Sequence, residues 1–352
     1  GRLLKGSRGE NYDQQLDRIR RLVNERRFAL GVQLILKHRD PLDIMMGYAN
    51  VAEGAIRALA EATTREFEQL HGRVEGGELL ILGLGRLGGR ALTHASDLDL
   101  IFIFDAPEGS SSDGARPLSA TDYYNRLARR AVTAFSVPTA SGPLYDVDTR
   151  LRPQGKEGMM AVRLDAFADY QQSEAWTWEH MALLRARPVH GPKAGRARLD
   201  AVIRAVLGSA HDQAKVRADA AKMRDEMARH KPPSGPLDIK LGPGGLVDLE
   251  FAVHTLQLTT GAGFDPRLEC AIAALAEAGH LTMQADADLR LLSRILVTMR
   301  LVAPDGSIPP PESRPLVAEV CGHADWDTLL AAHGEARQRV SALWARVREG
   351  EA

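Results

Sequence analysis

Two aspartates spaced two residues apart, Asp97 and Asp99, follow a glycine-rich turn in the segment LLILGLGRLGGRALTHASDLDLIFIFD, residues 79–105. Alternate side chains of a β-strand point to the same face, so a strand beginning here places both carboxylates on one face. Carboxylate oxygens are preferred ligands of Mg²⁺, and backbone amides in a glycine-rich turn can approach phosphate closely. The segment therefore indicates phosphate and divalent-metal chemistry. The alternative is a pair of solvated acids that open a strand.

The glycines of this segment also fit a second pattern. Gly83, Gly85 and Gly88 match the G-x-G-x-x-G fingerprint of dinucleotide-binding folds, and Asp105 stands where a ribose-binding acid is expected. A parallel crossover needs a dozen or more residues, mostly helical, yet residues 86–96 are all that separates the two apolar runs. A dinucleotide fold also has no use for the acids at the start of the second run. The sequence favours a metal site over this fold.

A second polar cluster lies in LYDVDTRLRP, residues 144–153. Its strict alternation predicts a strand with one charged face, made by Asp146, Asp148, Arg150 and Arg152. Such a face offers a third metal carboxylate beside guanidinium groups suited to phosphate. The alternative is a self-neutralising edge strand. Lys156, in the glycine turn that follows, either reaches a phosphate or lies in water.

Four blocks in order carry a resemblance to a known family. They are GLGRLGGRALTHASDLDLIFIFD, LYDVDTRLRPQGKEG, FADYQQSEAWTWEHMALLRARPV and DIKLGPGGLVDLEF. They resemble the signature blocks of the glutamine synthetase adenylyltransferase family, within the polymerase-β-like nucleotidyltransferase superfamily, from about residue 11 to the end. The resemblance implies two related halves in the family. One transfers AMP from ATP to a tyrosine of glutamine synthetase, and the other removes it by phosphorolysis, giving ADP.

This chain carries one copy of each block, so it corresponds to one half. The stretch EAWTWEH, residues 174–180, resembles the C-terminal, AMP-adding half, and a start at Gly1-Arg2 without methionine suits an excised portion. We therefore expect an adenylyltransferase. Four alternatives stay open. They are the deadenylylating half, a small-molecule nucleotidyltransferase that would need an enclosed acceptor pocket, a dinucleotide-dependent oxidoreductase that would need a parallel doubly wound sheet and no metal, and a regulatory module without activity, against which the intact acids argue.

The resemblance also implies the site. Two Mg²⁺ or Mn²⁺ ions are expected on three catalytic and metal-binding acids, Asp97, Asp99 and Asp148; Asp148 is also a candidate base. Residues expected to bind the nucleotide are Gly83, Gly85, Arg86, Gly88, Gly89, Ser96, Arg150, Arg152 and Lys156. Expected partners are glutamine synthetase as substrate, with the PII signal protein and glutamine as effectors of the longer enzyme.

Composition agrees with this interpretation. With 352 residues and a formal net charge of −1, the chain has no strong attraction for nucleic acid or anionic membrane, and neither is an expected partner. Cys270 and Cys321 are isolated and show no zinc-ligand spacing. Few cysteines and no membrane-length apolar run indicate a reducing, cytoplasmic location.

The expected fold is α+β and mostly helical: a polymerase-β-like nucleotidyltransferase domain with a small mixed or antiparallel sheet, N-terminal helices and a C-terminal helical bundle. The expected domains are 1–75, 76–192 and 193–352. Helices are predicted at 13–36, 43–68, 121–136, 174–187, 214–229, 267–279, 286–302 and 326–348, with a break at Asp40-Pro41. Trp176 and Trp178 are expected to pack rather than to stack on adenine.

One segment of the C-terminal part is unusually polar for its apolar surroundings. Lys240, Asp248 and Glu250 lie in or just after DIKLGPGG. They form either a wall of the nucleotide site or a docking surface for glutamine synthetase. The structural alternative is a capped helix start, with Leu246 among the core-facing residues. The sequence favours this structural role for Glu250 and does not decide between the two roles for Lys240.

Overall fold

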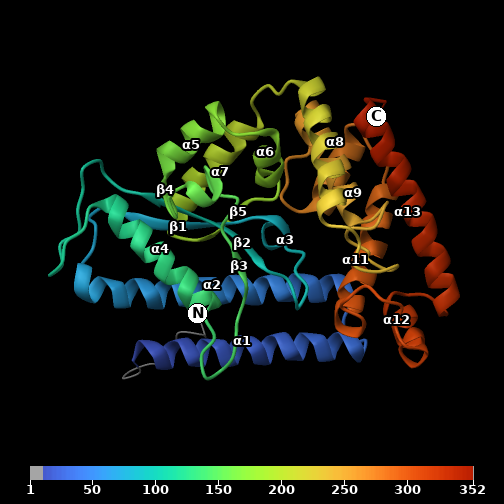
Figure 1. Cartoon of the computed structure of the whole chain (residues 1–352), viewed down its shortest axis with the longest axis horizontal. Helices are drawn as coiled ribbons and strands as arrows, with labels where there is room; N and C mark the ends of the chain where they lie inside the picture. The colour runs from blue at the N-terminus through green and yellow to red at the C-terminus, as the bar shows by residue number, and fades with distance from the viewer. Residues whose placement is uncertain (1–10, 352) are drawn as a thin grey trace.

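The computed structural model describes residues 11–351 of the chain (Figure 1). Two long helices, α1 (Tyr12–Ile35) and α2 (Pro41–His71), pack side by side along one face of the molecule. Asp40 caps α2, since its side chain accepts a hydrogen bond from the backbone N of Leu42 at 2.8 Å. Pro41 takes the first helical position, where its missing N–H costs nothing. The predicted break at Asp40-Pro41 is confirmed.

Within the described residues, one mixed sheet contains β1 (Glu78–Gly83), β2 (Leu98–Asp105), β3 (Val147–Asp148), β4 (Ala161–Arg163) and β5 (Arg187–His190). The strand order is β3-β2-β1-β5, and β4 also pairs with β2. β1 is antiparallel to β2 and β5, whereas β3 and β4 run parallel to β2. The helix between β1 and β2 is the four-residue α3 (Gly85–Gly88), so no crossover joins them. This topology confirms the α+β prediction and excludes the dinucleotide-binding fold.

The two faces of β1 and β2 pack into different hydrophobic cores. Leu80, Leu82, Ile101 and Ile103 belong to the core shared with the C-terminal helices. Leu79, Ile81, Leu100 and Phe102 belong to the core built with α1, α2 and α4 (Ala120–Ser136). Burial of each such side chain contributes about 1.5–3 kcal/mol. The sheet is thus packed between two hydrophobic cores, which fix the position of β2 and of the residues at its edge.

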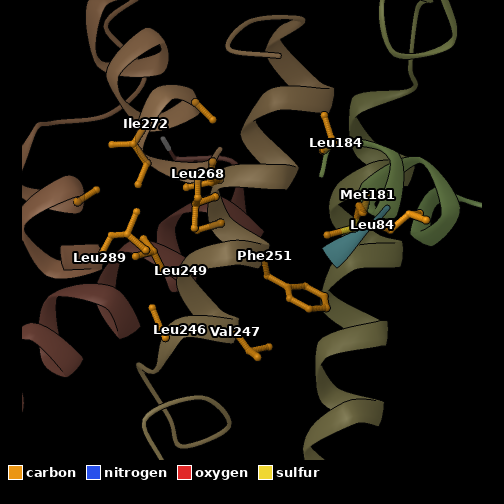
Figure 2. Close-up of a cluster of buried hydrophobic side chains, with 14 of the residues drawn as sticks. Leu84, Met181, Leu184, Leu246, Val247, Leu249, Phe251, Leu268, Ile272 and Leu289 are labelled. Carbon is orange, nitrogen blue, oxygen red and sulfur yellow. The ribbon is translucent and has the colours of Figure 1, made fainter. Parts of the chain in front are cut away.

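The remaining helices cover the second face of the sheet and continue into a bundle (Figure 1). They are α5 (Leu164–Ser173), α6 (Thr177–Leu183), α7 (Lys193–Leu207), α8 (Gln213–His230), α9 (Leu246–Thr260), α10 (Leu268–Glu277), α11 (Gln284–Val302), α12 (Arg314–Val320) and α13 (Trp326–Glu349), with short 3₁₀ turns at Gly155–Glu157 and Pro311–Ser313. The central helix of the bundle, α9, is buried almost all round. Leu249 of α9 packs near Leu268 of α10 and Leu289 of α11 (Figure 2), and Phe251 points toward Met181 of α6.

Of three predictions for residues 144–187, two are wrong and one is correct only in part. The expected strand over 144–153 is reduced to β3, because buried Arg152 donates to the carbonyl oxygens of Thr149 and Lys156 and holds the chain in turns. The expected helix over 174–187 is present as the shorter α6, and the chain then enters β5, whose pairing with β1 has no local sequence signal. Trp176 and Trp178 are 67% and 36% exposed, so neither is a core residue.

The other helix predictions are confirmed to within a few residues, and the C-terminal bundle is present from α7 onward. No helix in residues 11–351 is both long and apolar enough to cross a membrane. The domain boundaries at 75/76 and 192/193 stay a prediction.

Candidate active site

Three acids meet at one edge of the sheet, where β2 begins. Asp99 of β2 is the direct register partner of Asp148 in the parallel strand β3. The backbone N of Leu98 donates to the carbonyl oxygen of Asp146 at 2.9 Å, which extends this pairing by one residue. Asp97 lies immediately before β2 and is exposed. The fold therefore brings the acids of two motifs, about fifty residues apart in the sequence, to the same place.

The electrostatics of this edge favour a bound cation. Burial raises the pKa of Asp99 to about 6, and the neighbouring charges of Asp97 and Asp148 add to the rise. Repulsion among carboxylates is the condition that a divalent cation relieves, and an all-oxygen donor set is the one that Mg²⁺ and Mn²⁺ prefer. The donor chemistry thus fits the expected metal.

Asp148 is held by the side chain and backbone of Arg150. The Nε atom of Arg150 donates to both carboxylate oxygens of Asp148 at 2.9 Å, and the backbone N of Arg150 donates to Oδ1 at 2.8 Å. These bonds hold the pKa of Asp148 below its usual range. In the part of the chain that the structure describes, no three His, Cys, Asp or Glu side chains are grouped closely enough to hold a metal. The Arg150 side chain is 62% exposed, so the outer side of this ion pair faces solvent.

The glycine turn passes directly over Asp99. The backbone N of Leu84 donates to the carbonyl oxygen of Asp99 at 3.0 Å. Gly85 has φ of +53°, and a Cβ atom there would collide with Oδ2 of Asp99. Gly88 and Gly89 serve close packing instead, because Cβ atoms on them would meet the backbone and the guanidinium group of Arg185. Of these glycines, Gly85 is the one that lies against the acids.

The remaining predicted site residues lie at varying distances from this edge. The Ser96 hydroxyl accepts a hydrogen bond from the backbone N of Thr93 at 3.0 Å, which closes the turn before β2. Arg152 is buried and donates to backbone carbonyls, including that of Gly158 at 3.2 Å. Lys156 is exposed. The roles of these residues, of Gly83 at the end of β1 and of Arg86 toward a nucleotide stay predictions.

Sequence reasoning missed a buried ion-pair network beside the site. The Nη1 atom of Arg185 lies 2.6 Å from Oε1 of Glu250, and Nη2 of Arg86 lies 3.9 Å from the same oxygen. Burial raises the pKa of Glu250, but the guanidinium groups of Arg185 and Arg86 outweigh it and lower the pKa to about 2. Glu250 is thus more than part of a capped helix start. The sequence signal was an acid in an apolar helix.

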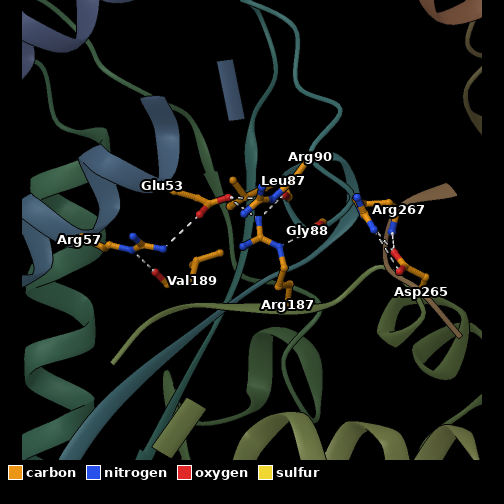
Figure 3. A network of polar contacts seen from close by, with 9 residues as sticks. All are labelled: Glu53, Arg57, Leu87, Gly88, Arg90, Arg187, Val189, Asp265 and Arg267. Carbon is orange, nitrogen blue, oxygen red and sulfur yellow. Dashed lines mark hydrogen bonds and ion pairs between the residues drawn. The ribbon is translucent and has the colours of Figure 1, made fainter. Parts of the chain in front are cut away.

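A second network links the glycine turn to α2 and β5 (Figure 3). Glu53 of α2 is buried and pairs with Arg187 of β5, with Arg57 at 3.2 Å and with Arg90 at 3.7 Å. The Nε atom of Arg187 donates to the carbonyl oxygen of Gly88 at 3.3 Å. The turn is therefore fixed between α2 and β5, and Gly85 is held against Asp99.

A mixed sheet that presents paired aspartates beneath a glycine turn is the arrangement of a nucleotidyltransferase. The family model described as glutamate-ammonia ligase adenylyltransferase matches residues 2–222, and the model described as GlnD PII-uridylyltransferase matches residues 215–347. The chain belongs to the glutamate-ammonia ligase adenylyltransferase family. The predicted resemblance is confirmed.

Curated relatives agree with this assignment. A bifunctional glutamine synthetase adenylyltransferase/adenylyl-removing enzyme of Mesorhizobium japonicum is 44% identical over 265 residues, which cover 75% of this chain and 27% of the relative. A protein of the same description from Rhizobium meliloti is 38% identical over 353 residues, covering 97% of this chain and 36% of the relative. The chain thus spans about a quarter to a third of the length of these relatives.

Proposed function

We propose that this chain transfers AMP from ATP to a tyrosine hydroxyl of glutamine synthetase and releases pyrophosphate. The observation that carries the proposal is the register of Asp99 with Asp148, with Asp97 beside them and Gly85 above, in a member of this family. The relatives' names, which join adenylyltransferase and adenylyl-removing activities, support the substrate. We also propose a cytoplasmic location and regulation by the PII signal protein and glutamine.

The mechanism follows from charge. The tyrosine oxygen, with an ordinary pKa of about 10, attacks the α-phosphorus of ATP, and the bond to the bridging oxygen of pyrophosphate breaks in line. Asp97, Asp99 and Asp148 would hold Mg²⁺ or Mn²⁺, which lowers the cost of deprotonating the hydroxyl and stabilises charge on the leaving oxygens. Arg150, once released from Asp148, would neutralise charge on the departing pyrophosphate, and Asp148 would accept the tyrosine proton.

Two features support a protein acceptor over a small molecule. Asp97 and Arg150 are exposed, so the edge is open to a folded partner. A cavity of about 260 Å³ lies nearby, but residues such as Met45, Arg86 and Glu250 line it, and the three aspartates are not among its lining residues. It therefore does not provide the enclosed acceptor pocket that a small-molecule nucleotidyltransferase would need beside the acids.

The direct test measures transfer of label from α-labelled ATP to unmodified glutamine synthetase with Mg²⁺, using the wild type and Asp97→Asn. We expect label on a synthetase tyrosine with the wild type and almost none with the variant. Release of ADP from adenylylated synthetase on addition of phosphate, without forward labelling, would identify the removing half instead. A result with neither label transfer nor ADP release in these assays would contradict the proposal.

Gly85→Ala is expected to lower AMP transfer by at least tenfold, because its methyl group must displace the Asp99 carboxylate. A non-glycine residue at positive φ also costs about 1–2 kcal/mol of folding stability. Gly109→Ala is the matched control, since Gly109 has φ of +69° and open space around its Cβ position. Both variants should lose similar stability in denaturant titrations, and Gly85→Ala alone should lose activity. Equal activities would show that Gly85 does not position Asp99.

A further inference from the structure

Two of the three charged residues that stand out in and after DIKLGPGG are accounted for by ion pairs. Asp248 pairs with Nε of Arg224 at 2.5 Å and accepts a hydrogen bond from the backbone N of Gly244 at 2.5 Å. Glu250 pairs with Arg185. The ammonium group of Lys240, by contrast, forms no ion pair or hydrogen bond with any residue of the described chain.

The position of Lys240 is nevertheless tightly specified. Oδ1 of Asp238 accepts hydrogen bonds from the backbone N of Lys240 at 3.0 Å and from that of Leu241 at 2.9 Å. The carbonyl oxygen of Lys240 accepts a hydrogen bond from the backbone N of Val247, in the first turn of α9, at 3.1 Å. The backbone that carries the Lys240 side chain is therefore held in place next to the start of α9.

Lys240 lies within electrostatic reach of the aspartate edge. It is only partly exposed, and the charged residues that act on it are Arg86, Glu250, Asp97 and Arg300, while Lys240 in turn acts on Asp99. Burial lowers the pKa of Lys240, which is the cost of holding an unpaired ammonium here. The ammonium group is thus near these aspartates without an ion pair to either, so its hydrogen-bond donors remain available to a substrate anion.

We propose that Lys240 binds the β- and γ-phosphates of ATP, so that the turn before α9 forms the phosphate-binding wall of the nucleotide site opposite the aspartates. This proposal rests on the proposed function, because it takes ATP as the substrate. In the proposed function, the α-phosphorus of ATP reacts beside the three aspartates. A lysine that is near these acids but not paired with them is suited to bind the β- and γ-phosphates. A lysine serves here as a compact point charge for phosphate oxygens.

The test is equilibrium binding of ATP and of AMP, each with Mg²⁺, to the wild type, Lys240→Met, Lys240→Arg and Lys222→Met. Methionine keeps the aliphatic stem but removes the charge. Lys222 is an exposed lysine of α8 and serves as the matched control. We expect Lys240→Met to weaken ATP binding about tenfold and AMP binding less than about twofold, since AMP lacks the outer phosphates. Lys240→Arg should retain most of the ATP affinity, and Lys222→Met all of it.

Other outcomes are equally decisive. Equal weakening of ATP and AMP by Lys240→Met would overturn the proposal, as would no change in either. Wild-type protein that binds ATP but labels no synthetase would refute the proposed acceptor and leave the assignment of Lys240 standing. Wild-type protein that does not bind ATP at all would refute both.

Discussion

Asp99→Asn is expected to reduce AMP transfer by about a thousandfold, because it removes charge from the carboxylate that faces Asp148 and lies beneath Gly85. Asparagine keeps the shape of aspartate, so the pairing of β2 with β3 should persist. The measurement is the initial rate of label transfer at saturating ATP and Mg²⁺. Asp105→Asn is the control: Asp105 ends the same strand, away from the site, and pairs with Arg198 at 2.9 Å.

The stability of this variant tests the electrostatics independently of activity. Burial and the charges of Asp97 and Asp148 raise the folded-state pKa of Asp99 from 3.8 to about 6. A carboxyl group whose pKa is raised on folding makes the folded state lose stability as pH rises from 3.8 through 6. The asparagine side chain cannot ionise, so the metal-free variant should melt at or above the wild-type temperature at pH 7, and this advantage should vanish below pH 3.8. A variant that melted lower and kept its activity would refute the metal-site assignment.

The central site could be predicted from the sequence because its residues carry local signals. The pair Asp97 and Asp99 stands at the start of an apolar strand, and Asp148 stands in a short charged segment. The sequence did not show that β3 would run parallel to β2 or be two residues long. Alternation of residue types in 144–153 was read as one strand, whereas the hydrogen bonds of buried Arg152 decide the local conformation.

The supporting residues could not be predicted for a different reason. Hydrophobic periodicity indicates which helix face is buried, but it does not identify the partner of a buried charge. Arg185 and Glu250 are 65 residues apart, and Glu53 and Arg187 are 134 apart, so only the fold brings them together. The strand β5 lacks a local signal because its pairing partner, β1, lies about a hundred residues earlier. The glycine fingerprint suggested a dinucleotide-binding fold for a similar reason. A distant residue, Arg185, contacts Gly88 and Gly89 and leaves no room for side chains there.

Arg185→Met is expected to lower the free energy of unfolding by about 3–5 kcal/mol, the usual cost of leaving one partner of a buried ion pair uncompensated. Arg185 is 6% exposed, and its Nη1 atom lies 2.6 Å from Oε1 of Glu250. Denaturant titration at pH 7 measures the loss. Arg73→Met is the control, because the Arg73 side chain is 75% exposed and water screens its pairing with Glu68, so this variant should lose little stability.

The pH dependence identifies which group is responsible. Because the pKa of Glu250 is lowered on folding from 4.5 to about 2, its ionised form stabilises the folded state above pH 4.5, and that contribution is lost as pH falls through 2. The difference between wild type and Arg185→Met should therefore shrink across this range. Arg185→Met combined with Glu250→Gln should recover part of the loss at pH 7, since no buried carboxylate is then left unpaired. If Arg185→Met cost no more than Arg73→Met, Arg86 alone, 3.9 Å from Glu250, would be sufficient to compensate the buried carboxylate.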